Sequence, residues 1–188
     1  TYARAMKYFV IFTLLAFLTV MAYIDVFKYI IAPDYWEGLR VVPVVMAAEI
    51  MMGIYFNLSF WYKLTDETRW GAYFSIIGCA VILGLNVWLV PTYGYVASAW
   101  ASVAGYGTIT LLSYVIGQKK YPVSYPLRSM AIYLLMAAVV YTLYQTISID
   151  NVWLRLGFRT VLLLAFVAYI VKRDLPLKSI PIINRFVK

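Results

Sequence analysis

Glu49 is the residue whose type and position most strongly suggest chemistry. It lies inside the apolar run from Leu39 to Tyr62. At 1.5 Å per residue it is about 14 Å from Arg40 and about 21 Å from Lys63, near the middle of a bilayer. A carboxylate that faced lipid there would cost several kcal/mol. We therefore expect Glu49 to face other helices, a cavity or a basic partner, or to be protonated. A substrate or coupling role, a structural ion pair and a hydrogen-bonded neutral acid all stay open.

Arg155 and Arg159 form a second candidate site. They are four positions apart and therefore share one helix face. Two guanidinium groups in a row could bind phosphate or carboxylate bidentately. Arg155 could instead extend to the membrane surface, and that accounts for it without a ligand. Arg159 lies one turn deeper, so anion binding and a position at the membrane surface stay open for it.

Asp25 and Lys28 are three positions apart near the end of the first apolar run. This spacing allows the two side chains to neutralise each other, and we expect an ion pair. Asn57 and Asn86 also lie in apolar runs, where an amide bridges helices by hydrogen bonds more often than it contacts a ligand.

Catalytic and metal-binding constellations are missing from the sequence. The chain has no His, and Cys79 is its single cysteine. Histidine bases, histidine-ligated metals and intrachain disulfides are therefore excluded. There is no phosphate loop of the G-x-x-x-x-G-K type either. We expect no enzyme activity, no metal and no cofactor.

The composition indicates lipid as the solvent. Hydrophobic residues make up 64% and charged residues 13% of the 188 positions, against roughly 25% charged in soluble domains. The stretch from Trp70 to Gln118 contains no charged residue. It is more than twice as long as the roughly 20 residues that one span needs. The net charge of +8 is spread over short gaps between apolar runs rather than clustered on one face, so we expect no nucleic-acid partner.

Hydropathy predicts an all-α integral membrane bundle of six transmembrane helices. Breakers in the short gaps between the runs mark the predicted boundaries, among them Pro33, Gly38 and the stretch KLTDETR. The predicted spans are Lys7–Ile31, Leu39–Tyr62, Trp70–Val90, Tyr95–Gly117, Leu127–Ile147 and Val152–Val171. Residues 1–174 are then one transmembrane lobe, and residues 175–188 a basic tail along the anionic cytoplasmic leaflet.

The positions of Lys and Arg predict the orientation of the bundle. With six spans, twelve of the 16 basic residues fall on one side; because basic residues accumulate on the cytoplasmic side, we expect both ends to be cytoplasmic. Aromatic residues at the span ends predict interfacial belts. The outer belt would hold Tyr35, Trp36, Tyr93, Tyr95, Tyr144 and Trp153, and the inner one Trp61, Tyr62, Trp70, Tyr121 and Tyr125.

Small residues recur every four positions in the third and fourth spans. Gly71, Ser75 and Cys79 form one stripe, and Ala97, Ala101 and Gly105 form another. Such stripes allow helix backbones to approach closely in lipid. Between these spans we expect Pro91 to stop one helix and Gly94 to allow the chain to reverse.

Two stretches resemble the C-terminal half of Wzx-type polysaccharide flippases, in the superfamily that includes multidrug and toxic compound extrusion transporters. They are NLSFWYKLTDETRWGAY and NVWLVPTYGYVASAWAS. The second contains the signature residues Asn86, Pro91, Tyr93 and Gly94. Val96, Ala97 and Ser98 follow where the family usually has residues resembling Gly-Ala-Ala, and the substitution keeps these positions small. The resemblance covers roughly residues 8–171.

The resemblance implies the second lobe of a transporter of 12 to 14 helices, in the bacterial inner membrane. Its partners would be membrane lipid, the N-terminal lobe of the same protein and a lipid-linked (undecaprenyl-pyrophosphate) oligosaccharide moved by alternating access. Because the chain begins at Thr1, we expect it to be cut from a longer protein. The resemblance also implies that the first two spans line the cavity, which fits Asp25, Lys28 and Glu49.

Three other functions are compatible with the sequence: a drug or cation antiporter of the same architecture, a non-transporting membrane scaffold and a glycan polymerase. A polymerase needs long extracytoplasmic loops, and the predicted outer loops are short. An antiporter needs carboxylates in its cavity, whereas a pyrophosphate carrier needs basic residues there. Arg159 favours the anionic substrate.

Overall fold

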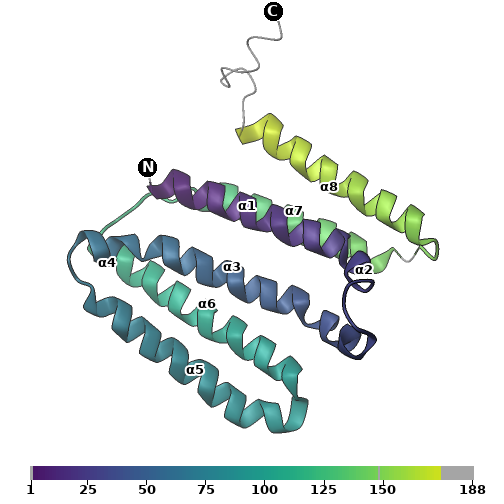
Figure 1. The fold of residues 1–188 in the computed structure, drawn as a ribbon. Coiled ribbons are helices and arrows are strands. Elements are labelled where there is room, and N and C mark those ends of the chain that lie inside the picture. Colours follow the sequence, from purple (N-terminus) through teal and green to yellow (C-terminus); the bar gives the residue numbers. More distant parts are fainter. Residues whose placement is uncertain (1, 148, 175–188) are drawn as a thin grey trace, which may run out of the picture. The chain divides into compact units, whose positions relative to one another are not determined.

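A computed structural model of the chain describes residues 2–147 and 149–174, and every regular element in these ranges is a helix (Figure 1). Six helical spans in this part of the chain are long and apolar enough to cross a membrane. The predicted all-α class with six spans is confirmed, and the chain is a multi-pass membrane protein by the length and composition of its helices. The predicted tail, residues 175–188, lies outside the described residues.

The elements follow one another with short connections. In chain order they are α1 (Tyr2–Ala22), α2 (Ile24–Phe27), a 3-10 helix η1 (Pro33–Arg40), α3 (Val42–Leu58), α4 (Phe60–Leu64), α5 (Arg69–Tyr93), α6 (Tyr95–Lys120), α7 (Leu127–Thr146) and α8 (Val152–Asp174). Together α3 and α4 form one span.

The chain divides into two compact units. The first unit comprises Thr1–Val10 and Ile31–Leu127, and the second comprises Ile11–Ile30 and Arg128–Lys188. The helix α1 contributes its beginning to the first unit and its end to the second. The sequence predicted a single lobe over residues 1–174 and offered no boundary of this kind.

Helix α6 is the central element of the first unit, because α3 and α5 both pack along it. The predicted small-residue stripe of α6 is buried at Ala97, Ala101 and Gly105. A Cβ atom on Gly105 would lie 3.3 Å from the carbonyl oxygen of Gly78 and closer still to a side chain of α5. The two backbones therefore approach closely, as predicted for lipid-embedded helices.

The stripe predicted on α5 is displaced by one position. Gly78, not Cys79, faces α6, where a Cβ atom would lie 2.9 Å from the side chain of Ile109, while Cys79 is exposed. Gly71 faces the ring of Tyr62 instead. A repeat of four drifts around a helix of 3.6 residues per turn, so its members do not all meet one partner.

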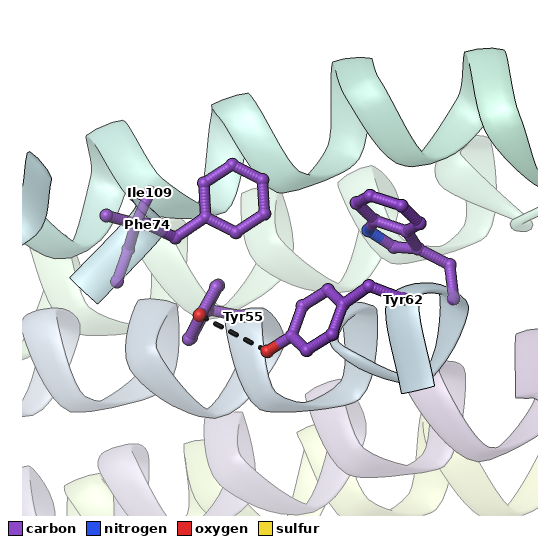
Figure 2. Close-up of a cluster of buried hydrophobic side chains, with 5 residues drawn as sticks. Tyr55, Tyr62, Phe74 and Ile109 are labelled. Carbon is purple, nitrogen blue, oxygen red and sulfur yellow. Dashed lines mark hydrogen bonds between the residues drawn. The ribbon is translucent and has the colours of Figure 1, made fainter. Parts of the chain in front are cut away.

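Buried aromatic rings pack together in the first unit. Figure 2 shows Tyr55 and Tyr62 joined by their hydroxyl groups, 3.3 Å apart, beside Phe74 and Ile109. Trp61 packs edge-on against Tyr62 and donates from Nε1 to the Ser113 hydroxyl at 3.2 Å. These rings replace part of the predicted inner belt: Trp61 and Tyr62 are buried, because α4 turns them toward α5 and α6 rather than outward.

The α5–α6 connection differs from the prediction in one respect. Helix α5 continues past Pro91 to Tyr93 and ends at Gly94, whose φ of 63° lies in the left-handed region. Pro91 was wrongly predicted to stop the helix: its ring removes one hydrogen bond, but the chain keeps helical geometry for two more residues. Gly94 makes the reversal, as predicted, because it has no Cβ to oppose a positive φ.

Candidate functional site

Asp25 is the centre of a charged cluster in the second unit. It lies in α2, the four-residue helix that follows the break after α1. Its Oδ2 atom is 2.9 Å from Nε of Arg155 and 3.0 Å from a terminal nitrogen of Arg159. The predicted Asp25–Lys28 pair is confirmed at 3.8 Å. The carboxylate is therefore shared by three cations, two of which the sequence placed more than a hundred residues away.

The four side chains differ in their exposure. The exposed fraction is 10% for Arg159, 17% for Asp25, 25% for Arg155 and 46% for Lys28. With one negative and three positive charges, the cluster has a net charge of +2. Its two most accessible cations are Lys28 and Arg155.

The two arginines use their donors differently. Arg159 donates to Asp25 and to the main-chain oxygens of Ala22 and Tyr144, each at 3.4 Å. Arg155 donates from a terminal nitrogen to the Ile149 carbonyl at 3.0 Å. The Nε groups of both are buried and have no hydrogen-bond acceptor among the described residues. For Arg155 the contact with Asp25 is therefore ionic, with the N–H directed elsewhere.

Tyr144 makes two further contacts with Arg159. The Tyr144 ring lies 5.8 Å from the guanidinium carbon, within cation–π range, and its hydroxyl donates to the Arg159 carbonyl at 3.0 Å. Beside Arg159 in the sequence, the Thr160 hydroxyl lies 3.0 Å from the Tyr23 hydroxyl, so a hydrogen bond joins α8 to the residue that follows α1. The sequence placed Tyr144 in an interfacial belt, and no spacing signal connected Tyr23 or Thr160 with the arginines. Their roles follow from tertiary contacts alone.

Glu49 and Asn57 lie in α3, in the first unit, whereas the Asp25 cluster lies in the second. Glu49 is exposed, and its side chain makes no hydrogen bond or ion pair within the described residues. A substrate or coupling role for Glu49 stays a prediction.

The two asparagines do not bridge helices. Asn57 donates to the Gly53 carbonyl at 3.0 Å, and Asn86 donates to the Ile82 carbonyl at 2.7 Å. Each amide thus bonds one turn back within its own helix, and the predicted interhelical bridges were wrong. The i−4 carbonyl is the nearest acceptor for a side chain with few polar neighbours.

An exposed ion pair at the end of a span gives a contrast. Glu67, in the connection between α4 and α5, accepts hydrogen bonds from Lys120 and from the Trp70 indole, the latter at 2.8 Å. The hydrogen bond from Lys120 is the main reason that the pKa of Glu67 is lowered. No group of His, Cys, Asp and Glu suited to a metal occurs in the part of the chain that the structure describes.

Comparison with known proteins adds no functional assignment: no protein-family model, curated protein or solved structure matches the chain.

Proposed function

We propose that the chain is one lobe of an alternating-access flippase that moves an anionic, lipid-linked oligosaccharide across the bacterial inner membrane. The observation that carries the proposal is the Asp25 cluster, which has a net charge of +2 inside a six-span membrane protein. An excess of positive charge is expensive in such a protein and is retained where it meets a negative ligand.

Arg155 and Lys28 are the residues that would contact the substrate. Both are partly exposed and both flank the same carboxylate. A pyrophosphate group offers several oxygens to a guanidinium and an ammonium at once. Arg159 is too buried and too fully engaged to share this task directly.

A binding measurement with the chain in lipid nanodiscs tests the proposal. The probes are a polyprenyl pyrophosphate and the corresponding uncharged polyprenol, each at several salt concentrations. We expect Arg155→Ala and Lys28→Ala to weaken pyrophosphate binding at least about tenfold, since one charge-assisted hydrogen bond contributes roughly 1.5–3 kcal/mol. Polyprenol binding should not change.

Lys63→Ala is the matched control, because it removes an exposed positive charge from the first unit. If Lys63→Ala weakens binding as much as Arg155→Ala, attraction is a property of the net charge and the assignment fails. Equal affinity of the unchanged protein for the two probes would also contradict it.

Glu49 favours a second candidate, a cation or drug antiporter of the same architecture. Its carboxylate is exposed on an apolar span and is not engaged by the described residues. In that case Glu49→Gln would abolish uptake of an organic cation by the full-length transporter in proteoliposomes, while Arg155→Ala would leave uptake intact. The flippase proposal expects no organic-cation uptake to begin with.

A further inference from the structure

The helix break after α1 leaves a main-chain oxygen open to a side chain. Helix α1 ends at Ala22, and Tyr23 departs from helical geometry with φ −103° and ψ 15°. The N–H of Val26 donates to the Tyr23 carbonyl at 2.9 Å instead of extending the α1 ladder. The Ala22 carbonyl thus lies at a helix C-terminus, where partial negative charge accumulates.

A second helix end contributes the same kind of atom. Tyr144 is two residues before the end of α7 at Thr146, so its carbonyl belongs to the last turn. Carbonyls of the last turn have no donor inside their helix. A carbonyl that is buried in the protein, as this one is, needs a hydrogen-bond donor from another part of the chain.

Three oxygens therefore surround one position: the Ala22 and Tyr144 carbonyls and the Asp25 carboxylate. Together they carry one full negative charge and the negative ends of two helix dipoles. Membrane proteins often bind cations through main-chain carbonyl oxygens and carboxylates at interrupted helix ends. Here the terminal nitrogens of Arg159 contact all three oxygens, at 3.0 to 3.4 Å.

We propose that these three oxygens form a cation site and that the Arg159 guanidinium is its permanent occupant, tethered through α8. Two consequences follow. Asp25 is not available to bind a transported or coupling cation, because an internal cation already neutralises it. The site also selects a planar cation with diverging N–H donors, because two nitrogens of one group reach oxygens on different helices. The inference does not depend on the flippase proposal.

Chemical rescue of Arg159→Ala tests the inference. The 188-residue chain in lipid nanodiscs is heated with increasing millimolar methylguanidinium chloride, and the unfolding midpoint is compared with that in equal concentrations of KCl and NaCl. We expect the variant to unfold at a lower temperature and methylguanidinium to restore it saturably. At tenfold above its dissociation constant the ligand raises the ratio of folded to unfolded protein about 11-fold. The unchanged protein should show no such gain.

Arg155→Ala is the matched control, since Arg155 sits one turn away and pairs with the same carboxylate but donates to one carbonyl only. It should not be rescued, and adding Asp25→Asn to Arg159→Ala should abolish the rescue. Equal restoration of the two arginine variants, or equal restoration of Arg159→Ala by KCl, would overturn the proposal.

A second measurement covers the case in which Arg159→Ala does not survive purification. Membranes containing the variant are solubilised with either methylguanidinium chloride or KCl, and the monodisperse fraction is quantified. We expect at least a severalfold higher yield with methylguanidinium. Equal yields would refute the tethered-cation assignment.

Discussion

Replacing Asp25 by Asn removes the carboxylate that Arg155 and Arg159 share, and the resulting loss can be compared with a second ion pair in the same chain. Removing one partner of a buried pair costs about 3–5 kcal/mol, because the remaining charge stays buried. Asp25 and Arg159 both retain a small exposed fraction. We therefore expect Asp25→Asn to cost about 3 kcal/mol, the lower end of that range.

A double-mutant cycle isolates the Asp25–Arg159 interaction from the other contacts of Arg159. Its corners are Asp25→Asn, Arg159→Met and the double variant, with stability followed by reversible unfolding in mixed micelles. The bonds from Arg159 to the Ala22 and Tyr144 carbonyls are lost in both variants that lack the guanidinium, so they cancel. The expected coupling energy is about 2–3 kcal/mol, near the top of the range for contacting residues.

Glu67 and Lys120 provide the control cycle. Their atoms approach at least as closely as those of Asp25 and Arg159, but the side chains are 41% and 37% exposed. Water and salt screen exposed pairs, so we expect their coupling to be a small fraction of that in the Asp25 cluster. If the Glu67–Lys120 coupling equals or exceeds the Asp25–Arg159 coupling, burial does not determine these energies and the reasoning is wrong.

Two further predictions concern the first unit. Gly117→Ala should destabilise the chain by about 1–3 kcal/mol in equilibrium unfolding, since the new methyl would lie 2.7 Å from the buried Trp61 ring. Gly84→Ala should stabilise the chain by about 0.5–1 kcal/mol, because a Cβ atom at Gly84 would meet no side chain and no other helix within 4 Å. If the two variants lose the same stability, the close contact at Gly117 does not determine its cost. Because Lys120 lowers the pKa of Glu67, this carboxylate contributes stability above its usual pKa of 4.5 and loses it as the pH falls through the lowered value. Glu67→Gln should flatten that part of a stability–pH profile, and an unchanged profile would show that the pair contributes nothing.

Hydropathy was sufficient to predict the six spans, because each apolar run is long enough to be recognised without knowledge of its neighbours. The first span shows the limit of this reasoning. It was predicted to run to Ile31, but α1 ends at Ala22, and neither Gly nor Pro lies near the break. The broken end is held by contacts from Arg159, 137 residues away. Local sequence carries no sign of a partner so distant.

The sequence identified charged residues of interest, but it predicted only one of the contacts between them. The i, i+3 spacing was enough to predict the contact of Asp25 with Lys28, because a single helical turn sets that geometry. The shorter contacts with Arg155 and Arg159 require α8 to pack beside α2, and no pattern in either segment specifies this. For Asn57 and Asn86 the nearest acceptor was in the same helix, so the interhelical prediction failed.

The turn at Gly94 also has a consequence for how the protein is made. Helices α5 and α6 and their turn lie in the stretch from Trp70 to Gln118, apart from their outermost residues, and this stretch contains no charged side chain. Moving a charged residue to the bilayer centre costs roughly 2.5–3.5 kcal/mol on insertion scales, and here no such cost arises. In the folded protein the two helices approach each other closely at Gly105. The two helices can thus enter the lipid together as a hairpin during biosynthesis. For these two of the six spans, the insertion machinery moves no charged side chain across the membrane.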